Sequence, residues 1–350
     1  MARKLSPLVH FIGIGGIGIS ALAHWFLAKK WAVSGSDIAE SSITRELRKE
    51  GVRVKIGHKR ANFPSIAAMA VYSSAVSKAN PELAEARRKG IRPLSYPETL
   101  GCLTEAYRTI AISGSHGKST TTAFVGLILK KAGLDPTVVI GTKLREFGNS
   151  NFRAGRGKLL VLEADEWNRS FLHYSPFAAL VTNIDREHLD TYKDLADVKR
   201  TFLKFLSQTQ KGGFLILNRD DRNVYSLRSP IGQIAKSKSL KVFWYSLKQQ
   251  VKGKVRRALK IPGEHNVSNA LAAYTVATKV FHIPSRIALQ AIARYKGAWR
   301  RMEYRGKLPT TNYQLPVYDD YAHHPTEIKA TLAAFREKFS DQKIICVYQP

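Results

Sequence analysis

The chain has 350 residues, is 44% hydrophobic, and carries 56 lysines and arginines against 27 aspartates and glutamates, for a formal net charge of +29. The apolar fraction argues against a disordered chain and the length predicts two or three domains. Two cysteines, Cys102 and Cys346, cannot form a disulfide framework, so a reducing, cytoplasmic setting is expected, whereas the charge alone suggests a nucleic-acid-binding protein.

The first apolar run, Leu8–Ala28, is long enough to be a membrane span or an export signal. Its first half, however, contains Gly13, Gly15, Gly16 and Gly18, and no small-residue cleavage site follows it. A strand, a glycine turn and a helix explain the run better. We therefore expect neither export nor membrane insertion.

Along the chain, short apolar runs alternate with amphipathic stretches, which is typical of α/β domains with mainly parallel sheets. Strands are predicted at Val9–Ile12, Ala32–Gly35, Ala70–Ser73, Arg108–Ser113, Leu159–Glu163, Ala178–Asn183, Phe214–Asn218, Lys241–Tyr245 and Lys343–Val347. Helices are predicted at Ser41–Glu50, Pro81–Lys89, Ser119–Lys131, Ala196–Gln210, Asn266–Phe281 and Pro325–Lys338.

These elements predict three blocks, residues 1–105, 106–298 and 299–350. The first two each open with a strand, a glycine turn and a helix. The third holds little more than a strand–helix–strand unit, which cannot bury its faces well. It is therefore expected to be an incomplete domain.

A phosphate-loop motif is the strongest chemical signal. It lies between a predicted strand and a predicted helix and consists of Gly114, Ser115, His116, Gly117, Lys118, Ser119 and Thr120. The glycines allow backbone N–H groups to face phosphate oxygens, Lys118 can reach the β- and γ-phosphates, and Ser119 can bind Mg²⁺. Two residues separate the glycines where the consensus has four, so this is a variant. The alternative is a strand–helix turn that binds no ligand.

The first glycine turn, residues 13–18, has the Gly-x-Gly-x-x-Gly pattern, and Asp37 ends the next predicted strand. An acidic residue at that place meets a ribose in dinucleotide-binding folds. The pattern is weak by itself. A dinucleotide, another diphosphate ligand and a tight structural turn all remain open.

Carboxylates and a histidine follow two neighbouring predicted strands. The string Glu163-Ala164-Asp165-Glu166 ends one strand, and His188 lies in the run Asn183–Asp190 after the next. Ligands of α/β sheets lie at the carboxyl ends of strands, and carboxylates there suit Mg²⁺. Each run alone is more often a solvated loop or a helix cap, but beside a phosphate loop the metal interpretation is favoured.

Further along, Asn266 and Asn269 lie one turn apart on a predicted helix, where the other interpretation is capping. The runs Arg300–Glu303 and Asp319–Glu327 bracket the first strands of the third block. The paired histidines in the second run suggest zinc. No His-x₃-His, HExxH or CxxC spacing completes a tetrahedral site, however, so zinc is not expected.

Taken in order, the motifs resemble those of the Mur ligase family: the first glycine turn, then GSHGKSTTT, EADE, TNIDREHLD, GEHNVSNALAA, RRME and DDYAHHPTEI. The resemblance covers essentially the whole chain. It implies three domains: a Rossmann-like UDP-sugar-binding domain, a central ATP-binding α/β domain with the phosphate loop, and a partial Rossmann-like C-terminal domain. Family members continue beyond the last predicted strand, so the resemblance also implies that part of the amino-acid site is missing.

The resemblance implies roles for the site residues. The glycines of the first turn would hold the UDP diphosphate, with Asp37 among the substrate-binding residues. ATP and Mg²⁺ are the implied cofactors. Lys118 and Arg301 would hold the ATP phosphates and act in catalysis, with the adenine facing Asn266 and Asn269.

Ser119, Glu163 and His188 would bind the Mg²⁺ ion. His116 would lie where the sugar-linked carboxylate and the γ-phosphate meet, and Tyr321 and His323 would lie near the amino acid. The residues after EADE, Trp167–Arg169, depart from many members, which puts fine substrate contacts in doubt.

The implied reaction joins L-alanine to the lactyl carboxylate of UDP-N-acetylmuramate through an acyl phosphate, in peptidoglycan synthesis. A relative that adds a ready-made peptide and a nucleotide-binding fragment without ligase activity are alternatives. A nucleic-acid-binding protein is disfavoured, because basic runs such as Lys248–Arg257 are short and lack interleaved aromatic residues. We expect a cytoplasmic monomer or weak homo-oligomer that binds no nucleic acid.

Overall fold

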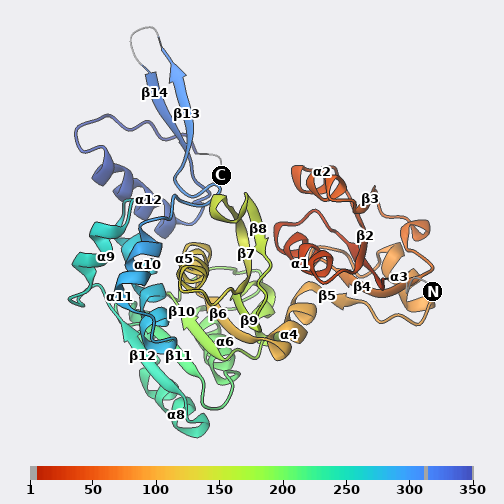
Figure 1. Ribbon diagram of the computed structural model, residues 1–350, viewed down its shortest axis with the longest axis horizontal. Helices are drawn as coiled ribbons and strands as arrows, with labels where there is room; N and C mark the ends of the chain where they lie inside the picture. Colours follow the sequence, from red (N-terminus) through yellow and green to blue (C-terminus); the bar gives the residue numbers. More distant parts are fainter. Residues whose placement is uncertain (1–5, 311–313, 349–350) are drawn as a thin grey trace.

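The computed structural model describes residues 6–310 and 314–348, which form three separate sheets (Figure 1). The prediction of an α/β fold with mainly parallel sheets is confirmed. The first sheet uses residues between 8 and 95, the second between 108 and 245, and the third between 303 and 319. Each sheet lies inside one of the predicted blocks 1–105, 106–298 and 299–350, whose boundaries stay a prediction.

The first sheet is parallel throughout, with the strand order β3-β2-β1-β4-β5. The order reverses at β1, and ligands bind at such switch points, outside the carboxyl ends of the strands. The glycine turn 13–18 therefore occupies the ligand-binding end of this sheet. The elements are β1 (Leu8–Ile12), α1 (Ile17–Ala28), β2 (Ala32–Asp37), α2 (Ser42–Lys49), β3 (Arg53–Ile56), η1 (Arg60–Asn62), β4 (Ala67–Tyr72), α3 (Pro81–Arg88), β5 (Leu94–Ser95) and α4 (Tyr96–Ala106).

The second sheet has the order β12-β11-β10-β6-β9-β7-β8 and is parallel except for the edge strand β8. Its strands are β6 (Arg108–Ser113), β7 (Thr137–Leu144), β8 (Ser150–Arg153), β9 (Leu159–Glu163), β10 (Ala178–Val181), β11 (Phe214–Asn218) and β12 (Lys241–Tyr245). The strands β9 and β10 flank β6, so the acidic string and the run 183–190 emerge beside the phosphate loop.

Helices pack around this sheet, and α5 begins directly after the phosphate loop, buried from Ser119 to Leu129. Its burial explains why the segment has no polar face. The helices are α5 (Lys118–Lys131), η2 (Arg145–Phe147), η3 (Trp167–His173), α6 (Leu195–Ser207), α7 (Arg222–Ser226), α8 (Arg228–Lys238), α9 (Lys252–Ala258), α10 (Glu264–Thr275), the π-helical turn η4 (Val276–Val280) and α11 (Ser285–Ile292).

The third sheet is an antiparallel hairpin of β13 (Glu303–Pro309) and β14 (Gln314–Asp319), which projects away from the two larger sheets (Figure 1). Helix α12 (Pro325–Lys338) follows it and packs against α10. The Tyr318 ring of β14 contacts Phe335 and Phe339, with ring centroids 5.2 and 5.8 Å apart. These aromatic contacts hold α12 to the hairpin.

The predicted strand Lys343–Val347 is wrong. These residues have no regular structure, and Ile345 and Val347 are 68% and 94% exposed. An apolar run becomes a strand only where a sheet edge supplies hydrogen-bond partners, and among the described residues the run pairs with no strand.

The sequence prediction missed the β7–β8 hairpin, which joins the first two domains. Helix α1 packs against both strands, and the Asn151 side-chain amide donates to Ser20 Oγ at 3.0 Å. The Lys143 ammonium adds an ion pair with Glu46 at 2.7 Å. Among the helices of the described ranges, none is long and apolar enough to cross a membrane.

Candidate functional site

The phosphate loop after β6 has the conformation that its glycines permit. Gly114 and Gly117 have φ values of +135° and +82°. A Cβ atom at Gly117 would overlap the Asn269 side-chain amide, so this position needs glycine for space as well as for conformation. Asn183 fixes the loop, because its Oδ1 accepts from His116 N at 2.8 Å and its Nδ2 donates to the His116 carbonyl at 3.0 Å.

The Lys118 ammonium is surrounded by carboxylates. It donates to both Glu166 oxygens, at 2.8 and 3.0 Å, and lies 3.7 Å from Asp165. Burial alone would lower the pKa of Lys118, but Glu166 and Asp165 raise it above its usual range. Burial in turn raises the pKa of Glu166 to about 7, against the opposing effect of Lys118. Lys118 is therefore a fixed cation at the start of α5.

Oxygen ligands for a metal ion lie beside this lysine. Ser119 Oγ donates to Glu163 Oε1 at 3.0 Å, and Gly141 N donates to the other Glu163 oxygen at 2.7 Å. Mg²⁺ prefers hard oxygen ligands, which a serine hydroxyl and a carboxylate provide, so this pair fits Mg²⁺. His188 lies instead 3.7 Å from Glu166, in a separate cluster with Asp165.

His116 projects from the phosphate loop into a second cluster of charged side chains. Its Nε2 lies 3.0 Å from Asp185 Oδ2, and its Nδ1 lies 3.4 Å from Glu327 Oε1 and 3.9 Å from Glu187. Burial would lower the pKa of His116, but Glu327 and Asp185 raise it overall. Glu327 lies in the first turn of α12, so this cluster joins the phosphate loop to the third block.

Arg301 and His323 lie beside Glu327 of α12, and the Tyr321 ring contacts both of them. The Arg301 guanidinium is 3.6 Å from Glu327 and 5.8 Å from the centre of the Tyr321 ring. The Tyr321 and His323 rings meet edge to face at 5.3 Å, and His323 Nε2 lies 3.7 Å from Glu187. The structure thus brings the predicted residues of the third block to the mouth of the phosphate loop.

A cleft of about 330 Å³ separates the phosphate loop from α10 and α12. Asn266 and Asn269 are buried and line it together with Arg301. The Asn266 Nδ2 donates to the Pro262 carbonyl at 2.7 Å, which places this amide at the start of α10. The residues predicted to face the adenine base therefore line the same cleft as Arg301, which is predicted to bind the ATP phosphates.

The first glycine turn lies on the other large sheet. Gly13 N donates to the Ser36 carbonyl at 2.8 Å, and Gly15 N donates to Asp37 Oδ2 at 2.7 Å. A Cβ atom at Gly18 would lie 3.0 Å from the Tyr96 hydroxyl, so close packing at Gly18 leaves little room for a side chain. Asp37 thus holds the turn itself, a contact that the motif did not indicate.

Six residues that connect these parts, five of them acidic, were given no individual role by the motifs. They are Asp165, Glu166, Asp185, Glu187, Thr326 and Glu327. All six lie within motifs that also contain a predicted site residue, and Glu187 directly precedes His188. The signal available in the sequence was therefore the density of carboxylates beside the candidate cations.

Comparison with known proteins decides the family. The model "Mur ligase family, catalytic domain" matches residues 8–108, "Mur ligase middle domain" matches 112–277, and "Mur ligase, glutamate ligase domain" matches 300–350. The chain belongs to the Mur ligase family. The resemblance inferred from the motifs is thereby confirmed for this Mur ligase.

Relatives of this Mur ligase are closely similar over its whole length. It is 41% identical to the UDP-N-acetylmuramate–L-alanine ligase of Aquifex aeolicus, covering 100% of this chain and 79% of the relative. The ligase of that name from Persephonella marina is 42% identical, over 98% of this chain and 75% of its own.

Solved structures agree on the fold. The UDP-N-acetylmuramate–alanine ligase of Thermotoga maritima superposes with a TM-score of 0.77 at 28% identity, covering 96% of this chain and 79% of that one. A murein peptide ligase from Psychrobacter arcticus also gives a TM-score of 0.77, at 24% identity and with 96% and 77% coverage, and this likeness shows the fold alone.

Proposed function

We propose that this Mur ligase is an ATP-dependent enzyme that joins L-alanine to the lactyl carboxylate of UDP-N-acetylmuramate. The names and the identities of 41% and 42% of its relatives support this substrate pair. The observation that carries the chemistry is the cleft in which His116, Ser119 and Thr120 of the phosphate loop face Arg301 and Glu327.

In the proposed reaction the lactyl carboxylate attacks the γ-phosphorus of ATP, forming an acyl phosphate and releasing ADP. The amine of alanine then attacks the acyl carbon, and the tetrahedral intermediate expels phosphate. Both steps gather negative charge, so fixed cations and good positioning supply most of the catalysis. Lys118 and Arg301 would hold the phosphates, and Asn266 and Asn269 would face the adenine.

Ser119 and Glu163 would hold Mg²⁺, with His188 as the further candidate ligand. When bound, Mg²⁺ neutralises charge on the phosphoryl oxygens. His116 is the remaining candidate of the phosphate loop, and its imidazole lies among the carboxylates of Asp185, Glu187 and Glu327. It would lie where the substrate carboxylate and the γ-phosphate meet, while Tyr321 and His323 would contact the amino acid.

The first glycine turn would hold the UDP diphosphate at the switch point of the first sheet, with Asp37 fixing the turn. The division into residues 1–105, 106–298 and 299–350 belongs to the same proposal, as do a cytoplasmic location and a monomeric or weakly associated state. Both nucleotide ligands are anions, so the net charge of +29 would favour their encounter with the enzyme.

Measurement of ADP release tests the proposal. With UDP-N-acetylmuramate and ATP present, ADP should form rapidly when L-alanine is added, and the alanyl product should be visible by mass spectrometry. The peptide-adding alternative predicts preference for a tripeptide over L-alanine. Turnover that does not require alanine, or that prefers the tripeptide, would overturn the proposed substrate.

A further inference from the structure

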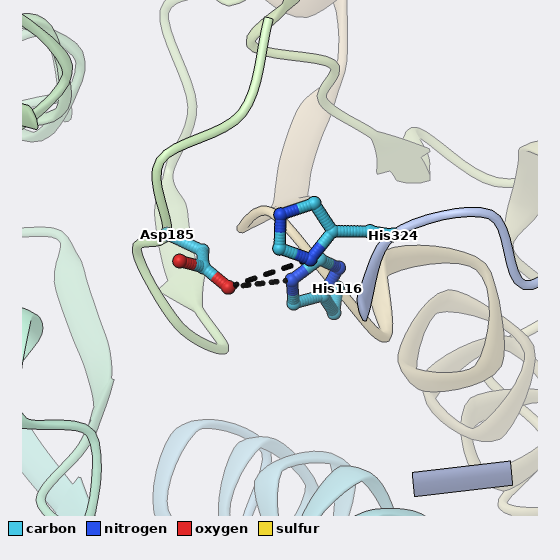
Figure 2. Close-up of side chains that lie close together, drawn as sticks. All are labelled: His116, Asp185 and His324. Atoms are coloured by element: carbon cyan, nitrogen blue, oxygen red, sulfur yellow. Dashed lines mark hydrogen bonds and ion pairs between the residues drawn. The ribbon is translucent and has the colours of Figure 1, made fainter. Parts of the chain in front are cut away.

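We propose that His116, Asp185 and His324 bind one divalent cation of the zinc class, at a site separate from the Mg²⁺ site of Ser119 and Glu163. The three side chains come from the phosphate loop, from the turn after β10 and from the residue before α12. Figure 2 shows them converging on one point. The inference concerns cation binding and does not depend on the ligase reaction.

The spacing of the side chains suits a tetrahedral ion. Asp185 Oδ2 lies 3.0 Å from His116 Nε2 and 3.7 Å from His324 Nδ1, and the two imidazole centroids are 4.9 Å apart. Zinc–ligand bonds of about 2.0–2.1 Å place neighbouring tetrahedral ligand atoms roughly 3.3 Å apart. These two separations bracket that value and the three ligand atoms lie within 4.8 Å of one another, so after small side-chain rotations the residues would supply three of the four ligands and water the fourth.

The chemistry of the donors selects the class of ion. Two imidazole nitrogens with one carboxylate suit zinc, cobalt or nickel, whereas Mg²⁺ prefers an all-oxygen set such as Ser119 with Glu163. Thr326 N donates to His324 Nδ1 at 3.3 Å, a contact that suits the tautomer with an unprotonated Nδ1. An unprotonated nitrogen is the form in which imidazole binds a metal, and the cation would replace the Thr326 N–H.

Outer partners of these ligands are also in place. Histidines that bind metals usually give their second ring N–H to a carboxylate. The second nitrogen of His116, Nδ1, makes no hydrogen bond within the described residues but lies 3.4 Å from Glu327 Oε1, and the Thr326 hydroxyl donates to Asp185 Oδ2 at 2.8 Å. A simple ion pair between His116 and Asp185 would not require His324 Nδ1 to lie 3.7 Å from the same carboxylate oxygen.

A cation at this site would connect the phosphate loop to the start of α12. His116 and Asp185 also line the 330 Å³ cleft, so the ion would lie in the cleft wall. The motif spacing could not reveal the site, because its ligands belong to three different motifs. Of the adjacent histidines His323 and His324, only His324 is one of the three proposed ligands.

The test is a titration of the metal-free full chain with Co²⁺ alone, without nucleotide or sugar, followed by visible absorption. Wild type should bind one Co²⁺ with the intense bands of tetrahedral coordination, and Zn²⁺ but not excess Mg²⁺ should remove them. His324→Ala removes a direct ligand and should weaken Co²⁺ binding by more than the ~10–100-fold typical of losing an outer partner. The matched control is His323→Ala, which removes the neighbouring histidine and should leave the bands unchanged.

Asp185→Asn provides a second test, because His324 caps α12 and its replacement could alter local structure. Circular dichroism establishes that each variant is folded. His188→Ala removes the other histidine-carboxylate cluster and should keep the bands. Wild type without tetrahedral bands would overturn the proposal, as would full Co²⁺ binding by both His324→Ala and Asp185→Asn, or loss of the bands in His188→Ala. Because no substrate is present, failure here leaves the proposed ligase activity untouched.

Discussion

The Lys118 ammonium lies 2.8 Å from one oxygen of Glu166 and 3.0 Å from the other. The Glu166 side chain is only 2% exposed and the Lys118 side chain 13%. The lysine of the phosphate loop is therefore held in place by a buried acidic partner, at the position where the phosphates of ATP are proposed to bind. Bound phosphates would replace part of this carboxylate environment.

Lys118→Ala should abolish ADP release that depends on UDP-N-acetylmuramate. Loss of one charge-stabilising group costs on the order of 10²–10³ in rate, and here the same group also binds ATP. Steady-state ADP formation measures the effect. Lys131→Ala is the matched control, because Lys131 is an exposed lysine at the other end of α5 and its loss should not change the rate. An active Lys118→Ala enzyme would remove the phosphate-loop assignment.

Glu163→Gln should raise the Mg²⁺ concentration needed for half-maximal activity. The Glu163 carboxylate accepts from Ser119 Oγ and Gly141 N and is the negative group nearest the loop serine. Loss of its charge should weaken metal binding ~10–100-fold. Activity measured against Mg²⁺ concentration at saturating ATP gives the value. Glu105→Gln, an exposed change at the end of α4, is the control, and an equal effect there would refute a metal role for Glu163.

Local patterns determined how much of the fold was predictable. The β6 strand, the phosphate loop and α5 follow one another directly, so their order is visible in the sequence, and Pro325–Lys338 is a helix with the predicted bounds. The segment Lys343–Val347 has the same apolar character as a strand yet pairs with nothing in the described ranges. A strand forms only when it pairs with another strand that is often distant in the sequence, and the local pattern of apolar residues does not predict that partner.

In the candidate site, too, the residue types could be predicted from local motifs but their contacts could not. The types and order of Lys118, Ser119 and Glu163 indicated phosphate and metal chemistry, and the structure places Ser119 against Glu163. The contact between Thr326 and Asp185 joins residues 141 positions apart, which no local spacing predicts. The sequence thus pointed to the participants, whereas their partners depend on how α12 meets the second sheet.

The acid side of the stability profile should depend on Glu85. Its hydrogen bonds from Arg88 and Arg60 lower the pKa of Glu85 to about 2 from an ordinary value of 4.5. A lowered carboxyl pKa contributes stability that is fully present above pH 4.5 and is lost as the pH falls toward 2. Glu85→Gln should therefore lower the melting temperature at neutral pH but make it less sensitive to acid. Thermal melts across that range measure this, and an unchanged acid slope would contradict it.

Gly117→Ala should impair ATP binding beyond any loss of stability. Gly117 and Gly133 have nearly the same left-handed conformation, with φ values of +82° and +80°. A methyl group at Gly117 would overlap the Asn269 amide, whereas at Gly133 it would meet nothing within 4 Å. Both alanine variants should therefore lose about 1–2 kcal/mol from backbone strain. Only Gly117→Ala should also displace Asn269 and distort the loop. Thermal unfolding together with binding of a fluorescent ATP analogue separates the two effects, and equal ATP affinity in the two variants would show that the contact with Asn269 is unimportant.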